Sequence, residues 1–341
     1  MKPKLDVGVI GLGRLGSINA ADVAHRIPNA NLLAVADIQE DRAKTFAHDH
    51  DVPRWYSSHQ ELIADPDVKA VVIVTPTSTH KEIVIEAAHH DKATFCEKPL
   101  SISLSETRKI RETIEKTGVF FQMGFQRRFD KGYVAARKKI AEGVIGDPIV
   151  LKASSRDPFR PPLEYADPKK SGGLIIDMAI HDFDVSRMFM GEVKSVYSVG
   201  CALAYPELKS INDIDNAIIT MYFESGALGV VDVSRNGVYG YDIRAEILGT
   251  KGTIKVGYLR ENPITILTQN SVAHDVVPYF MERFEKAYLD QIDNFVNNVL
   301  SGKEPPVTIA DGEAALIISQ AATISHHENR IVPITEIRES L

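Results

Sequence analysis

Short apolar runs alternate with amphipathic stretches through the first third of the chain. The runs have the length and content of strands, and the stretches between them carry the 3.6-residue apolar spacing of helices. The predicted strands are Val7–Ile10, Asn31–Ala36, Ala70–Thr75, Ala93–Cys96 and Val119–Gly124, and the predicted helices are Leu15–Arg26, Gln39–His50, Thr79–His89 and Ser103–Thr117. This alternation predicts βαβ units on a parallel sheet. Ser103, three residues before Glu106, predicts a capping box at the last helix.

The pattern changes after about residue 125. A strand is predicted at Ile149–Ser155, between helices at Lys131–Glu142 and Ile176–Met190. Turn signals then separate six more predicted strands: Ser195–Ala204, Asn216–Phe223, Ala227–Arg235, Asp242–Leu248, Thr253–Gly257 and Ile264–Thr268. These strands predict an antiparallel meander, and two helices, Tyr279–Leu300 and Asp311–His326, are expected to close the chain.

Length and charge narrow the classes of protein to which the chain can belong. Its 341 residues suggest two domains, or one large barrel. Its 39 basic and 46 acidic side chains give a formal charge of −7, which argues against a general binder of nucleic acid or anionic membrane. The two cysteines suit a reducing compartment. We expect a cytoplasmic protein, because the N-terminus does not resemble a signal peptide and no apolar run is long enough to span a bilayer.

A glycine motif, G-x-G-x-x-G, lies between the first predicted strand and helix. Gly11 permits a tight turn, Gly13 lets the backbone approach a pyrophosphate, and Gly16 lets the helix pack on the strand. Asp37 ends the next strand about 20 positions later, where a carboxylate accepts hydrogen bonds from the adenosine ribose and repels a 2′-phosphate. The motif favours NAD, although Arg14 leaves NADP open. The predicted cofactor contacts are Gly11, Leu12, Gly13, Arg14, Leu15, Gly16, Asp37 and Ile38.

These elements predict an α/β plus α+β protein. A Rossmann domain that binds NAD is expected over residues 1–125. A second domain over residues 126–341 is expected to have a large open, mostly antiparallel sheet, and to serve substrate binding and oligomerisation.

Three further segments carry a family resemblance. They are Cys96-Glu97-Lys98-Pro99-Leu100, Gly124-Phe125-Gln126-Arg127-Arg128-Phe129-Asp130 and Gly173-Leu174-Ile175-Ile176-Asp177-Met178-Ala179-Ile180-His181-Asp182. In this order after the glycine motif, they resemble the glucose–fructose oxidoreductase/inositol dehydrogenase family, over almost the whole chain. The phrase around Arg127, with Tyr133 shortly after, is most similar to the inositol dehydrogenase branch.

The resemblance implies a role for the lysine of the Glu-Lys-Pro segment. It places Lys98 between nicotinamide and substrate, where an ammonium group would stabilise the alkoxide that forms during alcohol oxidation. It implies that Glu97 orients Lys98 or contacts the cofactor. It also implies cofactor contacts from Thr75 and His80, in the loop after Val71–Val74.

Asp177 and His181 are four residues apart in a segment with helical spacing, so both side chains can share one face. Spacing alone favours a structural pair, but the family pattern implies that His181 is the base and that Asp177 holds it and a substrate hydroxyl. The acidic side chains of Asp182 and Asp184 also suggest a metal site. We expect no metal, because hydride transfer with a lysine electrophile needs none. Asp184 is expected to be a solvated charge or a structural partner.

A cyclic polyol offers many hydroxyl groups, so its site should contain charged and hydroxyl side chains. The resemblance implies substrate contacts from Arg127, Asp157, Tyr241 and Tyr288. Each has a structural alternative, an ion pair for Arg127 and packing for the tyrosines.

The leading hypothesis is therefore an NAD-dependent dehydrogenase that oxidises a ring hydroxyl of myo- or scyllo-inositol to an inosose. A sugar dehydrogenase or keto-sugar reductase of the same family is the alternative. A non-catalytic, dinucleotide-binding transcriptional sensor is an alternative of another class, against which Lys98 and His181 argue together. Because six strands leave a sheet face uncovered, we also predict self-association through such faces, and the resemblance implies a homotetramer.

Overall fold

The computed structural model describes residues 3–339 and divides into two compact units. The first unit consists of the chain up to Phe129 together with Lys286–Glu313. The second consists of Asp130–Glu285 together with the chain from Ala314 onward. The sequence-based boundary at residue 125 lies close to the first division, whereas residues 286–313 were expected in the second domain. Among the described residues, no helix is both long enough and apolar enough to cross a membrane.

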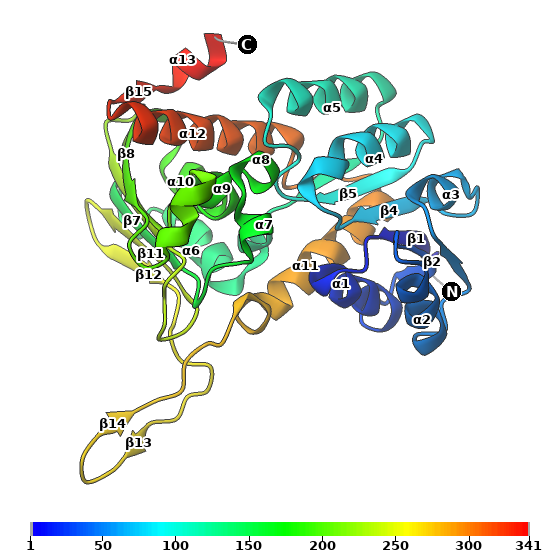
Figure 1. Ribbon diagram of the computed structural model, residues 1–341, viewed down its shortest axis with the longest axis horizontal. Helices are drawn as coiled ribbons and strands as arrows, with labels where there is room; N and C mark the ends of the chain where they lie inside the picture. The colour runs from blue at the N-terminus through cyan, green and yellow to red at the C-terminus, as the bar shows by residue number, and fades with distance from the viewer. Residues whose placement is uncertain (1–2, 340–341) are drawn as a thin grey trace. The chain divides into compact units, whose positions relative to one another are not determined.

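The first unit is built on a six-stranded parallel sheet in the order β3-β2-β1-β4-β5-β6 (Figure 1). Its strands are β1 Leu5–Ile10, β2 Ala30–Ala36, β3 Arg54–Tyr56, β4 Ala70–Ile73, β5 Ala93–Glu97 and β6 Phe121–Gly124. Its helices are α1 Arg14–His25, α2 Glu40–Asp49, α3 His59–Ala64, α4 Thr77–His89 and α5 Leu104–Thr117. The Rossmann prediction is confirmed. The pattern missed β3 and α3, which are too short to show a period.

The strand order reverses direction at the middle of this sheet. From β1 the chain builds outward through β2 and β3, then returns to the other side of β1 as β4. Ile10 is level with Ala36 of β2 and with Ile73 of β4, so three strands end at the same edge. Ligands of open α/β sheets bind at such a point.

The helix α11 (Phe280–Ser301) accounts for the return of the chain to the first unit. It has a non-helical φ/ψ at Phe284, and the part after that kink belongs to the first unit. There Phe295 packs against Phe95 of β5 and Phe120, with ring centroids 5.9 and 5.7 Å apart. The apolar core formed by β1, β2 and β4 therefore also includes this part of α11.

The predicted capping box at α5 is wrong. The Ser103 side chain makes no cap hydrogen bond and instead contacts Ser105 Oγ. Glu106 is held elsewhere, because its two carboxylate oxygens accept hydrogen bonds from Lys81 Nζ at 2.5 Å and from Ser101 Oγ at 2.7 Å. A competing ion pair therefore displaces the local motif.

The second unit contains a seven-stranded mixed sheet in the order β12-β11-β7-β10-β9-β8-β15. The strands are β7 Pro148–Arg156, β8 Val193–Cys201, β9 Asn216–Phe223, β10 Leu228–Ser234, β11 Asp242–Gly249, β12 Thr253–Val256 and β15 Val332–Pro333. The meander prediction holds for β8, β9 and β10. It is wrong between β10 and β11, because β7 lies between them and is parallel to β10, and it holds again for β11 and β12, which pair antiparallel. The expected open, mostly antiparallel sheet is confirmed.

Helices cover one face of this sheet: α9 packs against β9 and β10, and α10 packs against β7. The remaining helical elements are η1 Gln126–Phe129 in the first unit, then α6 Lys131–Ala141, α7 Leu163–Ala166, α8 Pro168–Ser171, α9 Gly173–Asp177, α10 Ile180–Met190, η2 Pro206–Ile211, α12 Ile309–Glu328 and α13 Ile334–Glu339. The backbone of Ser198 in β8 donates to Ser325 Oγ of α12 at 2.9 Å, which fixes α12 beside β8 (Figure 1).

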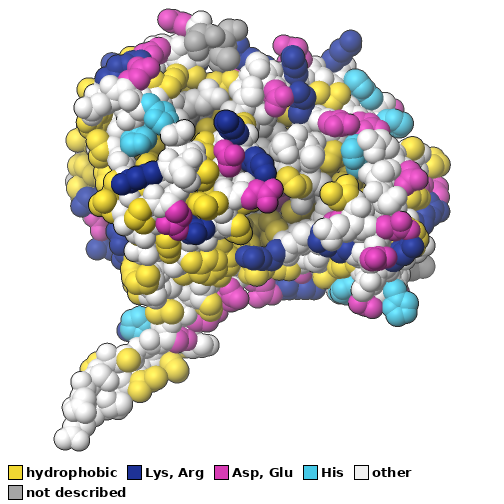
Figure 2. Space-filling view, in the orientation of Figure 1, with side chains coloured by type: hydrophobic (Ala, Val, Ile, Leu, Met, Phe, Trp, Pro, Cys, Tyr) yellow, Lys and Arg dark blue, Asp and Glu magenta, His cyan; other side chains and the backbone are white. Residues whose placement is uncertain are grey.

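A two-stranded ribbon projects from the second unit (Figure 1). It consists of β13 Ile266–Leu267 and β14 Val272–Ala273, which pair only with each other. The strand predicted at Ile264–Thr268 therefore forms outside the large sheet. Figure 2 shows hydrophobic side chains on this ribbon, and Leu267 and Val272 are each 74% exposed.

The glycine turn between β1 and α1 supplies a test of the fold. A Cβ added at Gly16 would lie 1.9 Å from the carbonyl oxygen of Gly11, whereas a Cβ added at Gly13 would meet nothing within 4 Å. We expect Gly16→Ala to lower the free energy of unfolding by about 3 kcal/mol or more, because backbone must move. The matched Gly13→Ala variant should unfold like the wild type in urea titrations without ligand. Equal stability of the two variants would contradict the close packing of α1 on this turn.

Candidate functional site

The glycine turn presents a helix start without a side-chain cap. Gly13 is the N-cap of α1 and makes no side-chain cap hydrogen bond, and the first turn has no acidic residue. Gly11 has φ +91°, and a Cβ there would lie 2.7 Å from the carbonyl oxygen of Val74. Leu12 is buried, Leu15 is half-buried, and Gly13 and Arg14 are exposed. The turn therefore has the open N–H groups and the room that a pyrophosphate requires.

Asp37 is bound to the glycine turn directly. Its Oδ2 accepts a hydrogen bond from the backbone N–H of Leu12, and its Oδ1 accepts one from Gln39, both at 2.8 Å. Arg42 Nη1 lies 3.2 Å from Oδ2 and 3.4 Å from Oδ1. The sequence showed Arg42 only as a distant basic residue, but one turn of α2 places it on the carboxylate. Ile38, beside Asp37, is 90% exposed.

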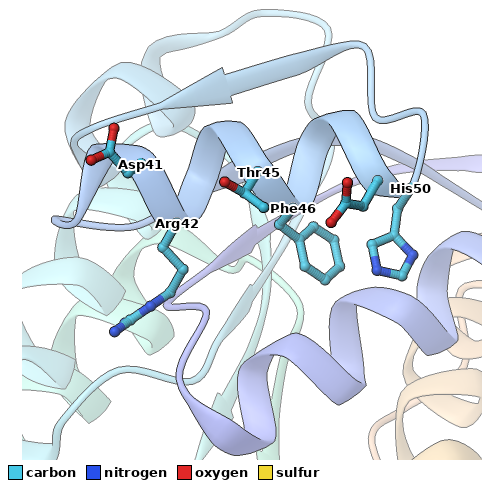
Figure 3. Close-up of a pocket in the computed structure, with 6 residues that line it drawn as sticks. Asp41, Arg42, Thr45, Phe46 and His50 are labelled. Carbon is cyan, nitrogen blue, oxygen red and sulfur yellow. The ribbon is translucent and has the colours of Figure 1, made fainter.

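Arg42 also borders a shallow hollow of about 370 Å³ on α2 (Figure 3). Phe46 and His50 stack there with ring centroids 4.2 Å apart, while Arg42 extends away from them. The guanidinium side chain is 41% exposed, so a ligand could reach it. The hollow contains none of the residues predicted from the sequence to form the site; its lining residues are Asp41, Arg42, Thr45, Phe46, Asp49 and His50.

His80 joins two loops at the carboxyl edge of the first sheet. It is 1% exposed, its Nδ1 lies 2.8 Å from the carbonyl oxygen of Pro99, and its Nε2 lies 2.9 Å from that of Thr75. Burial lowers the pKa of His80. Both ring nitrogens face backbone, so the structure gives His80 a supporting role between the loops. Direct cofactor contacts from His80 and Thr75 stay predictions.

The Glu-Lys-Pro segment ends β5 at the same edge. Lys98 is half-buried, while Glu97 is only 6% exposed. Glu97 Oε1 accepts a hydrogen bond from Gln291 Nε2 at 2.9 Å, and Oε2 accepts one from the backbone N–H of Lys98 at 3.3 Å. Burial raises the pKa of Glu97 to about 7, against the opposing effects of Gln291 and Lys98. Sequence reasoning missed Gln291, because nothing in an amphipathic helix distinguishes a glutamine with a carboxylate partner.

Two predicted substrate contacts also belong to the first unit. Arg127 lies in η1 directly after β6 and is 2% exposed, and Tyr288 lies on α11 and is 7% exposed. The next residue, Arg128, pairs with Asp311 at 2.9 Å, which holds the segment after β6. The substrate roles of Arg127 and Tyr288 stay predictions.

In the second unit, a cluster of charges surrounds Asp177 at the end of α9. Tyr165 donates its hydroxyl to Asp177 Oδ1 at 3.4 Å, and Arg235 Nη2 lies 3.6 Å from Oδ2. The negative charge of Asp177 and burial raise the pKa of Tyr165. Arg235 is fully buried and also binds Asp213 Oδ2 at 2.6 Å. The sequence gave no signal for this arrangement, because Arg235 simply follows an apolar strand.

His181 lies in the first turn of α10. The single helix expected over Ile176–Met190 is wrong, because α9 ends at Asp177 and α10 begins at Ile180. Ser155 Oγ donates to Asp182 Oδ1 at 2.8 Å, which ties the start of α10 to the end of β7. Asp184 is fully buried, which excludes the solvated alternative. Among residues 3–339, no three His, Cys, Asp or Glu side chains are grouped as metal ligands.

The end of β7 also leads to Asp157, and the neighbouring loop leads to Tyr241. The backbone of Asp157 bonds to Ser234 and Gly237, at 2.9 and 2.7 Å. Tyr241 is 7% exposed, and its ring centroid lies 5.8 Å from that of Tyr279. The second unit therefore ties the end of β7, next to Asp157, to the start of α10, where His181 lies. Whether Asp157 and Tyr241 bind substrate stays a prediction.

Relatives of nearly the same length are similar to this chain in sequence and in fold. The chain is 41% identical over 333 residues to myo-inositol 2-dehydrogenase of Thermotoga maritima, covering 97% of this chain and 99% of that protein. It is also 41% identical to scyllo-inositol 2-dehydrogenase (NAD(+)) of Bacillus subtilis, covering 95% of both. Among solved structures, scyllo-inositol dehydrogenase from Lactobacillus casei with bound NAD(H) and scyllo-inositol superposes with a TM-score of 0.92 at 29% identity, over 97% of this chain and 99% of that one.

Two family models match the two parts of the chain. The model of an oxidoreductase family with an NAD-binding Rossmann fold matches residues 5–125. The model of the C-terminal alpha/beta domain of the same family matches residues 137–334. Both the motifs and the fold agree with these matches, and the chain belongs to the Gfo/Idh/MocA oxidoreductase family.

Proposed function

We propose that this protein is an NAD-dependent inositol dehydrogenase that oxidises one ring hydroxyl of myo- or scyllo-inositol to the inosose. The observation that carries the proposal is Lys98, which follows a buried carboxylate at the edge of an NAD-binding sheet. Full-length relatives named as myo- and scyllo-inositol 2-dehydrogenases support the substrate class. The two cysteines are free thiols, which supports a reducing, cytoplasmic location.

The proposal gives each unit a part of the chemistry. The glycine turn and Asp37 would hold NAD, which would supply the acceptor for the hydride of the carbinol carbon. Lys98 donates a hydrogen bond from Nζ to the reacting oxygen and stabilises its negative charge. His181 takes the hydroxyl proton on a ring nitrogen, and Asp177, which lies 3.6 Å from Arg235 Nη2, holds His181 and a neighbouring substrate hydroxyl. Arg127, Asp157, Tyr241 and Tyr288 are the proposed contacts for the remaining hydroxyl groups.

The substrate class is tested with a panel of inositols and aldoses, each assayed with NAD and with NADP. We expect NAD reduction with myo- or scyllo-inositol and weaker turnover of aldoses. Preferred turnover of an aldose or reduction of a keto-sugar would instead support the alternative substrate class. A protein that binds NAD but transfers no hydride to it, even in a single turnover, would be a sensor.

Lys98→Ala should lower kcat by about a hundredfold or more, because the developing alkoxide loses its charged donor. Lys109→Ala, which removes an exposed lysine from α5, is the matched control and should retain wild-type turnover. NAD affinity measured by fluorescence quenching should change little in either variant. Wild-type turnover by Lys98→Ala would contradict the role of this lysine.

The pair formed by Asp37 and Arg42 predicts how cofactor preference can be changed. Asp37→Ser removes the carboxylate that repels a 2′-phosphate and leaves Arg42 without its ionic partner. We expect the kcat/KM ratio of NADP to NAD to rise about tenfold or more. In the double variant Asp37→Ser/Arg42→Ala the rise should be smaller, because only the loss of repulsion remains. An equal rise in the single and double variants would show that Arg42 takes no part.

The uncovered face of the second sheet supports a homotetramer. Tyr222, Leu228, Val150 and Leu248 form one row across four strands, and Val199 and Ile218 pair on β8 and β9. Five of these side chains are 40–54% exposed. An apolar row of this length on a sheet face is typical of an interface.

Light scattering should therefore give a mass four times that of the chain. Leu228→Lys should dissociate the assembly, because a charge would replace an apolar contact. Val144→Lys, at an exposed apolar position outside the sheet, should leave the mass unchanged. A monomeric wild-type protein would contradict the proposed assembly.

A further inference from the structure

Three polar side chains are enclosed where β5, β6 and α11 meet in the first unit. Glu97 is 6% exposed, and Gln122 and Gln291 are fully buried. Gln122 Nε2 donates to the backbone carbonyl of Gln291 at 3.1 Å, and Gln291 Nε2 donates to Glu97 Oε1 at 2.9 Å. Buried polar groups destabilise a fold unless they bind one another, so this chain of hydrogen bonds requires an explanation.

The packing leaves the carboxylate of Glu97 little freedom. Gly124 of β6 is its neighbour across the sheet, and a Cβ at Gly124 would lie 2.9 Å from Glu97 Cδ and from Oε1. On the other side, Gln122 and the ring of Phe295 hold α11 in place. One carboxylate oxygen is thus directed at Gln291 and the other at the backbone N–H of Lys98.

We propose that Gln291 is a positioning residue for Lys98, acting through Glu97. Its amide holds Glu97 as an oriented carboxylate, and this carboxylate fixes the backbone of Lys98 and places a negative charge next to it. This inference rests on the proposed dehydrogenase function, because it gives Lys98 the role assigned there.

The groups around Glu97 determine whether loss of the Gln291 amide raises or lowers the pKa of Glu97. Burial raises the pKa of Glu97, whereas the Gln291 amide and the Lys98 charge lower it, so that it lies at about 7. Cys96, the preceding residue on β5, stays a neutral thiol, because burial raises its pKa. From β6 and α11 the amides of Gln122 and Gln291 face this region. Loss of the Gln291 donor should raise the pKa of Glu97 further and neutralise it at neutral pH.

The first test compares pH profiles of inositol oxidation. Gln291→Met keeps the length of the side chain and removes the donor, so the acidic limb of kcat should shift upward by about one pH unit. Raising the pH should then restore most of the rate. Gln291→Glu, which places a second carboxylate beside Glu97, should shift the limb further in the same direction, and it serves if Gln291→Met does not fold.

A double-variant cycle separates positioning from a general loss of packing. In the Glu97→Gln background, Gln291→Met should not shift the limb, because the group through which it acts is absent. Asn298→Leu is the matched control, since it removes an amide from α11 that binds Asn294 at 3.0 Å. This control is expected to lower stability without moving the pH profile. A limb unmoved by Gln291→Met, or moved equally by Asn298→Leu, would overturn the proposal.

A second readout does not depend on turnover. In protein carrying ¹³C at glutamate carboxyl carbons, the resonance missing from Glu97→Gln reports the titration of Glu97. Its midpoint should rise by about one pH unit in Gln291→Met. An unchanged midpoint would refute the coupling of Gln291 to Glu97. If no polyol or sugar is oxidised but the midpoint moves, the dehydrogenase function fails while the coupling stands.

Discussion

The parallel pairing of β1 with β2 and β4 is the constraint on which the first unit depends. Parallel strands present their carboxyl ends at one edge, and the strand order reverses at β1, the position where open α/β sheets bind ligands. Gly11, Asp37, Thr75 and Lys98 each follow one of these ends or the neighbouring end of β5. Without this pairing, residues separated by tens of positions would not share a surface.

A second level of organisation supports that edge with buried polar contacts. Asp37 holds the glycine turn, His80 spans two loops, and Gln291 fixes Glu97. In the second unit, Arg235 likewise holds side chains in place, because it is fully buried between the carboxylates of Asp177 and Asp213. Buried charges are stable only when paired, so each of these contacts restricts a side chain to one position. Such restriction lets a site act without reorganising.

Sequence patterns predicted most of the strands and long helices, because burial on one or both faces of an element gives its apolar residues a regular spacing in the sequence. Where the structure departs, a competing interaction is the reason. Glu106 forms an ion pair with Lys81 instead of the capping box predicted with Ser103. The meander is interrupted by β7, and the pairing of β7 with β10 and β11 cannot be recognised in the local sequence. The return of α11 to the first unit depends on Phe295, whose partners Phe95 and Phe120 are 200 and 175 residues away in the sequence.

The sequence by itself determined the Rossmann fold, the family, the preference for a dinucleotide and the candidate residues Lys98, Asp177 and His181, since each rests on local motifs. Only the tertiary structure decided which side chains surround them. Packing between distant segments brings Gln291 to Glu97 and Arg235 to Asp177. Polar contacts of this kind produce no regular pattern in the sequence. The physical reason is that backbone geometry and burial act over a few residues, whereas the pKa of a buried group depends on everything that folding brings against it.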